Sequence, residues 1–69
     1  DPNDDAAYVN RGNIYALQGN DDAALADYNR AIALNPKSSA AYHNRGQLYE
    51  EHGQDEQAQA DYDQANSLR

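Results

Sequence analysis

Two arginines that are each followed by an aspartate sixteen residues later are the side chains best suited to a specific polar contact. Arg11 precedes Asp27, and Arg45 precedes Asp61. A guanidinium presents a rigid fork of donors that fits a carboxylate. Each arginine could pair with its own aspartate across two antiparallel helices, or grip a carboxylate of a partner. We favour the internal pair, which predicts that Arg11→Leu leaves partner binding unchanged, because surface arginines near carboxylates commonly pair within the chain.

Other residues of reactive types are not arranged as a catalytic or metal site. The chain has no cysteine, which excludes thiol nucleophiles, disulfides and cysteine-based zinc sites. His43 and His52 have no other ligand at a metal-binding spacing, so we expect them in solvent or along a groove. The adjacent carboxylates at 21–22 and 55–56 lack the alternating ligands of a calcium loop, and helix capping explains them better. The sequence therefore predicts no enzyme activity, no metal and no cofactor.

The charge balance restricts the class of partner. Twelve acidic and five basic residues give a net charge of −7, which argues against nucleic acid and anionic membrane surfaces. It favours neutral or basic proteins and peptides. No apolar run approaches membrane-spanning length and there is no basic, hydrophobic leader, so we expect no membrane insertion, and the compartment is not encoded. Because the chain opens on Asp1-Pro2 rather than on methionine, we expect an excised domain.

The chain repeats itself at a distance of 34 residues. Residues 6–15 are AAYVNRGNIY and residues 40–49 are AAYHNRGQLY. The correspondence continues to the end of the chain, and all six tyrosines fall in matched pairs. Self-similarity at a fixed period of this length predicts a solenoid of stacked units.

Small and aromatic residues at i, i+4 and i+7 predict two helices in each unit. The positions concerned are Tyr8, Gly12, Tyr15, Ala24, Tyr28 and Ala31, and then Tyr42, Gly46, Tyr49, Ala58, Tyr62 and Ala65. We expect helices near 5–18, 22–34, 39–52 and 56–68. A glycine within a helix costs about 1 kcal/mol relative to alanine. Gly12 and Gly46 therefore predict a close approach of helices, with Ala24 and Ala58 as the expected neighbours.

Glycines and a proline mark the ends of these helices. Gly19 and Gly53 suit the left-handed residue that follows a helix. Asn35-Pro36 breaks the chain between the units, because proline disfavours helix in the residue before it. The short connections predict antiparallel packing of sequential helices. The fold class is thus predicted to be all-α, an α-solenoid of two antiparallel helix-turn-helix hairpins with four helices.

Candidate N-caps precede each helix. Asp4 and Ser38 stand at equivalent positions of the repeat, and either can cap the first helix of its unit. For the second helices the candidates are Asp21 or Asp22 in the first unit and Asp55 in the second.

This pattern resembles the tetratricopeptide repeat, whose period is also 34, and the resemblance rests on Tyr8, Gly12, Tyr15, Gly19, Ala24, Tyr28, Ala31 and Pro36 and on their counterparts in the second unit. It implies one unit at 5–38, a second at 39–69, and a tail of a preceding unit at 1–4. The chain departs from the family where Arg11 and Arg45 replace the usual leucine, and where tyrosine replaces a first aromatic that is often tryptophan.

The resemblance also implies a function, because tetratricopeptide arrays usually hold a peptide or partner helix in a concave groove lined by the first helix of each unit. The face opposite the tyrosine and glycine positions should line it, namely Val9, Asn10, Asn13, Ala16 and Leu17 in the first unit and His43, Asn44, Gln47, Glu50 and Glu51 in the second. Side-chain amides there can donate to and accept from an extended peptide backbone.

Some members of the family clamp a C-terminal carboxylate with lysine, asparagine and arginine on this face. Asn13 and Asn44 match the asparagines of that clamp, but Val9 stands where its first lysine would be. Glu50 and Glu51 would repel a carboxylate and suit a lysine or arginine of the ligand. The alternative for these two carboxylates is a solvated helix end.

Three apolar positions of the first unit become polar in the second: Leu17 to Glu51, Leu25 to Gln59 and Ile32 to Asn66. A polar outer face is expected of a capping unit, so the array should end here. About three units are normally needed for a stable stack, and self-association through the repeat ends stays open. A structural or assembly element, or an excised or engineered fragment without its own ligand, is the alternative function. The two units differ at their groove positions, and this difference favours the binding function over the assembly function.

Overall fold

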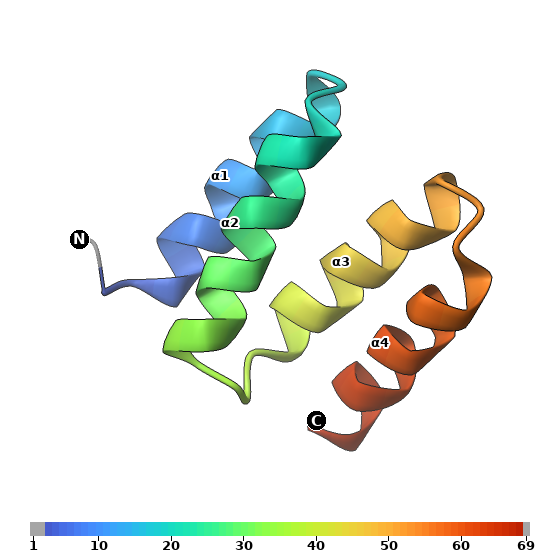
Figure 1. Ribbon diagram of the computed structural model, residues 1–69. Coiled ribbons are helices and arrows are strands. Elements are labelled where there is room, and N and C mark those ends of the chain that lie inside the picture. Colours follow the sequence, from blue (N-terminus) through green and yellow to red (C-terminus); the bar gives the residue numbers. More distant parts are fainter. Residues whose placement is uncertain (1–2, 69) are drawn as a thin grey trace.

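The computed structural model describes residues 3–68 as four helices joined by short turns (Figure 1). They are α1 (Asp5–Leu17), α2 (Asp21–Leu34), α3 (Ser39–Glu51) and α4 (Asp55–Ser67). Each bound lies within one residue of the prediction, and the all-α class is confirmed. None of these helices is long and apolar enough to cross a membrane.

The helices form two antiparallel hairpins that lie side by side. α1 packs on α2 and α3 packs on α4, while α3 also contacts both helices of the first hairpin (Figure 1). The buried cluster at this junction contains Val9, Ala24, Tyr28, Ala31, Ala41 and Leu48. Most of these side chains are small, so the helices approach closely. Tyr28, at 2% exposure, is the largest side chain in this cluster.

The predicted caps of the first helix in each hairpin are confirmed. A carboxylate oxygen of Asp4 accepts from the backbone N–H groups of Ala6 (3.0 Å) and Ala7 (3.4 Å). The hydroxyl oxygen of Ser38 accepts from the N–H of Ala41 at 3.3 Å. These bonds satisfy donors that the first turn of a helix leaves unpaired.

The predicted N-caps of the second helices are wrong by one residue. Gly19 and Gly53 have φ angles of 77° and 74°, the left-handed conformation expected after a helix. Each turn closes with the next residue, because the N–H of Asn20 donates to Tyr15 and that of Gln54 to Tyr49, both at 2.9 Å. Asn20 and Gln54 thereby occupy the N-cap positions, and the side chain of Asn20 accepts from Ala23 while Gln54 makes no side-chain cap.

The aspartates expected as caps instead begin the helices. Asp21 and Asp22 lie in the first turn of α2, and Asp55 lies in that of α4. Carboxylates in a first turn still stabilise a helix, because they lie near the positive end of its dipole.

The two glycines within helices do mark close approaches, and at both of them the nearest atoms belong to a tyrosine ring. A Cβ at Gly12 would lie 2.7 Å from Cε1 of Tyr28. At Gly46 it would lie 3.0 Å from Cε1 of Tyr62 and 3.2 Å from the carbonyl oxygen of Ala58. Ala24, the neighbour expected for Gly12, is not among the nearest contacts because the ring of Tyr28 fills that space.

We predict that Gly12→Ala destabilises the chain and that Gly46→Ala does so less. Alanine gains about 1 kcal/mol of helix propensity, while overpacking costs roughly 1–3 kcal/mol. Tyr28 is buried and cannot move away, whereas Tyr62 is half-buried and can, so that at Gly46 only the 3.2 Å contact with the carbonyl oxygen of Ala58 stays tight. The expected net loss is up to about 2 kcal/mol for Gly12→Ala and smaller for Gly46→Ala, measured by urea unfolding followed by circular dichroism. Equal stability of the two variants would contradict this assignment.

Candidate functional site

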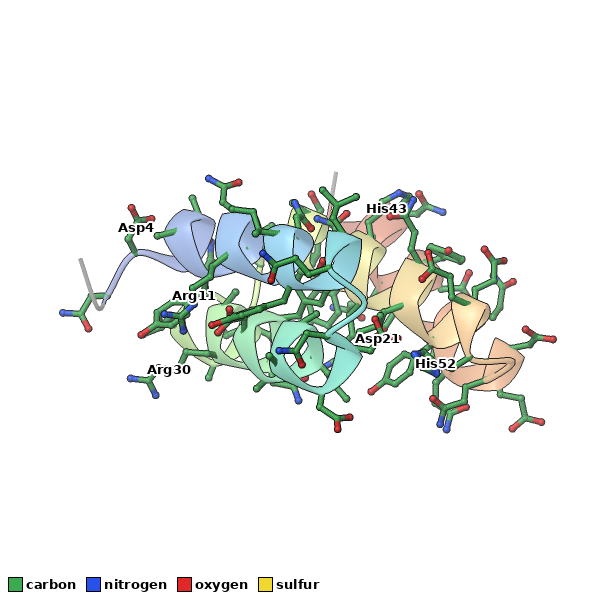
Figure 2. All side chains as sticks on the ribbon, turned by 90° about the horizontal axis from the view of Figure 1, so that it is seen from above. Asp4, Arg11, Asp21, Arg30, His43 and His52 are labelled. Atoms are coloured by element: carbon green, nitrogen blue, oxygen red, sulfur yellow. The ribbon has the colours of Figure 1, made fainter. Side chains whose placement is uncertain are left out.

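The two arginines form the internal pairs that were favoured from their spacing. Arg11 donates from Nε and Nη2 to the two carboxylate oxygens of Asp27, both at 2.8 Å. Arg45 binds Asp61 in the same way at 2.9 and 2.8 Å. Both aspartates are buried, and in Figure 2 Arg11 lies between α1 and α2. Each pair therefore ties the two helices of one hairpin together.

Tyrosines flank each guanidinium, because they stand three residues before and four residues after the arginine on the same helical face. The guanidinium carbon lies 5.4 and 5.9 Å from the ring centroids of Tyr8 and Tyr15 in the first hairpin, and 5.5 and 5.8 Å from those of Tyr42 and Tyr49 in the second. The hydrogen bonds to Asp27 and Asp61 raise the pKa of both guanidinium groups. These arginines are occupied within the fold.

Two polar contacts join the hairpins through residues that do not line the groove described below. Nη1 of Arg45 donates to Oδ1 of Asn29 at 2.8 Å, so this arginine links three helices. Nε2 of His52 lies 2.6 Å from Oδ2 of Asp21, and Figure 2 shows the two side chains together. His52 is exposed, as expected, but its ring is also bound to Asp21, because the angle between the hairpins brings the start of α2 to the end of α3.

A groove of about 320 Å³ lies between α1 and α3. Residues of both helices line it together with one tyrosine of α2: Asn13, Ala16, Leu17, Tyr28, Asn44, Gln47, Leu48 and Glu51. On α3 the lining residues recur at three- and four-residue steps, which places them on one helical face. The two parallel faces supply amide groups at one end of the groove, and Leu17 and Glu51 stand at the helix ends at the other.

A hydrogen-bond network orients the amide groups. Oδ1 of Asn13 accepts from the hydroxyl of Tyr28 at 2.6 Å and from Nδ2 of Asn44 at 3.1 Å. With its oxygen occupied in this way, Asn13 keeps its amino group for a donor role; that group makes no hydrogen bond to another residue of the described part. Gln47 is exposed and makes no side-chain bond there either. The groove thus offers amide donors and acceptors to a ligand backbone.

The groove is negatively charged. Burial, followed by the charge of Glu51 and then that of Asp27, raises the pKa of Tyr28. Burial, and next the charge of Glu50, raises the pKa of Tyr62, whose hydroxyl donates to Oε1 of Glu50 at 3.3 Å. The carboxylates at the end of α3 therefore contribute to the raised pKa of both phenol groups.

Of the residues expected along the groove, the structure brings together Asn13, Ala16, Leu17, Asn44, Gln47 and Glu51. Asn10, His43 and Glu50 are exposed but lie outside its lining, and the ring of His43 packs at a tilt on that of Tyr62, with centroids 5.4 Å apart.

The expectation that Val9 lines the groove is wrong, because Val9 is only 6% exposed and belongs to the core. It shares a face of α1 with Asn13, but one turn nearer the start of the helix. There Ala41, at the start of α3, lies in the same buried cluster and the space between the helices is closed.

Sequence reasoning missed two lining residues. Leu48 stands four residues after Asn44 and three before Glu51, and this helical spacing could have revealed it. Tyr28 was assigned to the repeat pattern only. No local signal could show that its hydroxyl reaches Asn13, because that contact depends on how α2 packs against α1.

Comparison with known protein families gives two matches. The family described as TPR repeat matches residues 12–53, and the family described as tetratricopeptide repeat matches residues 39–69. The first match alone spans more than half of the chain, and together they include every residue that lines the groove. No curated protein matches the chain significantly.

We predict that Arg45→Lys destabilises the chain more than Arg11→Lys. Lysine keeps the charge next to the buried aspartate but loses the forked geometry in both cases. Only at Arg45 is a bond to the other hairpin lost as well, and this bond is exposed, so the difference should be about 1 kcal/mol, the net value of a typical hydrogen bond. Urea unfolding of both variants measures it, and equal losses would show that the Asn29 bond does not stabilise the junction.

Proposed function

Because the chain belongs to the tetratricopeptide repeat family, we propose that it is a protein–protein interaction module that binds an extended segment of a partner in the groove between α1 and α3. Repeats of this family are in general protein-interaction modules. The observation that carries the proposal for this groove is the meeting of oriented amide groups with an exposed apolar side chain. Asn13 and Asn44 are held by hydrogen bonds, and Leu17 is 89% exposed.

An extended segment fits this combination of groups. Its unpaired backbone N–H and C=O groups need partners when they leave water, and side-chain amides provide both kinds. Leu17, Ala16 and Leu48 add an apolar wall against which a side chain of the ligand would be buried. The net charge of −7 favours a neutral or basic partner through long-range steering.

The second hairpin supports the proposal as a terminal unit. Gln59 and Asn66 are exposed on α4, whereas their counterparts Leu25 and Ile32 pack against the core of the first hairpin. A polar outer helix of this kind needs no further unit to cover it. The units at 5–38 and 39–69 would then each contribute their first helix to the binding face.

A second candidate function is assembly through the open side of the first hairpin. Ile14 is 54% exposed, although Leu48 at the same position of the second unit is 4% exposed and buried against the first hairpin. The side chain of Arg11 is likewise 58% exposed, against 21% for Arg45. A second copy of the chain that covers this side of α1 would bury Ile14 as the first hairpin buries Leu48.

For groove binding we predict that Leu17→Ser combined with Gln47→Ala weakens ligand affinity. Peptides are first selected on an array, and their dissociation constants are then measured by fluorescence anisotropy. Because both side chains are exposed, the variant should fold normally and lose about tenfold in affinity, or about 1.4 kcal/mol. The matched control is Gln57→Ala, an exposed glutamine on α4 outside the groove. The same affinity for the groove variant and the control would contradict the proposal.

For assembly we predict a different outcome at another position. If copies associate through α1, sedimentation should report two chains or more, and Ile14→Ser should return the chain to a monomer at the same concentration. The exposed Gln57→Ala on α4 serves as the control, because Gln57 lies away from α1. A monomeric wild type would rule this second candidate out.

A further inference from the structure

One end of the groove carries a single free charge. Glu51 is the only charged residue among those that line it, and no described lysine, arginine or histidine belongs to the lining. Glu51 is exposed at the end of α3, and its carboxylate makes no hydrogen bond or ion pair with another residue of the range 3–68. Its charge nevertheless acts inside the groove, because it contributes to the raised pKa of Tyr28.

The other carboxylates that face a helix junction are engaged, which sets Glu51 apart. Asp27 and Asp61 are bound by arginines, Asp21 by His52, and Glu50 accepts from Tyr62. A positive group that enters the groove therefore meets a carboxylate with no competing partner in the described fold. It would not have to displace an existing bond.

An apolar surface stands opposite this carboxylate. Leu17 and Glu51 occupy equivalent positions of the repeat, so the end of α1 presents a leucine where the end of α3 presents a charge. Leu17 is one of only two large apolar side chains that the described residues leave exposed. Ala16 and Leu48 extend this apolar surface into the groove.

A side chain that matches both surfaces must combine an apolar stem with a cationic head. Lysine and arginine are built this way, since their methylene stems pack on apolar surface while the head stays hydrated or paired. A carboxylate would be repelled by Glu51 and Glu50. A purely apolar side chain would cover Leu17 but would leave the carboxylate of Glu51 partly dehydrated without a partner.

We infer that the end of the groove between Leu17 and Glu51 binds a lysine or arginine side chain of the partner segment, with its stem on Leu17 and its cation paired with Glu51. The inference rests on the proposed function, because it names the chemistry of the segment that the groove would hold. It makes the carboxylate at the end of α3 the group that selects among ligands, while the amides bind their backbone.

The test uses three short peptides that differ at one central position. Each is Ser-Ala-Xaa-Ala-Ser with an acetylated N-terminus and an amidated C-terminus, where Xaa is lysine, Nε-acetyl-lysine or norleucine, so that only the lysine peptide is charged. Titration into the ¹⁵N-labelled 69-residue chain is followed by NMR through the side-chain amide signals of Asn13, Asn44 and Gln47. We expect the lysine peptide to bind about three- to fivefold more tightly than the other two, the size of a solvent-exposed ion pair.

The decisive variant is Glu51→Gln, with Glu56→Gln as its matched control. Both substitutions remove one negative charge from an exposed side chain and preserve its shape, but Glu56 lies in the first turn of α4 outside the groove. The lysine preference should vanish in Glu51→Gln and persist in Glu56→Gln. Circular dichroism of both variants checks that the helices are intact.

The possible failures are distinguishable. If the lysine and norleucine peptides shift the groove amides at equal concentrations, or if both variants reduce the preference equally, the cation site is wrong while groove binding stands. If none of the peptides shifts these amides, and an array of longer segments also yields no binder, the proposed function itself fails and the cation site with it.

Discussion

The contact between the ring of Tyr28 and the backbone of α1 at Gly12 is the constraint on which the groove depends. Because Gly12 has no side chain, the ring can lie where a Cβ would be only 2.7 Å away. From there its hydroxyl donates to Oδ1 of Asn13, and the same oxygen also accepts a hydrogen bond from Nδ2 of Asn44 on the other hairpin. A close approach within one hairpin thus orients the amides between the two.

The two hairpins are built in the same way but make different contacts at their edges. In both, an arginine between two tyrosines binds a buried aspartate of the partner helix. Only in the second does that arginine also bind the preceding hairpin, through Asn29, and only there is the residue at the Ile14 position buried. The same local sequence therefore packs against a neighbouring hairpin in the second unit and stays exposed in the first, because only Arg45 and Leu48 follow another hairpin.

The chemical properties of the groove come from positions at which the two units carry different residues. Asn13 corresponds to Gln47 and Leu17 to Glu51, so each wall presents a different group at the same height. A strictly repeated sequence would give two equal walls. The identical residues hold the helices together, and the differing residues decide which ligand chemistry the groove accepts.

The sequence by itself determined the four helices and their turns, and it favoured the internal ion pairs. These follow from short-range rules, namely the helical spacing of small and aromatic residues, the left-handed glycines at 19 and 53, and the sixteen-residue separation of Arg11 from Asp27 across a tight hairpin. Most of the groove lining could be predicted as well, because residues on one face of a helix remain on one face in the fold.

Only the tertiary structure decided which parts of that face are open. Val9 and Asn13 lie on the same side of α1, yet the start of α3 covers the first and leaves the second in the groove. The pairing of His52 with Asp21 and the entry of Tyr28 into the groove have the same origin. The angle between neighbouring helices sets all three, and it results from the sum of many contacts between residues far apart in the chain rather than from any local pattern.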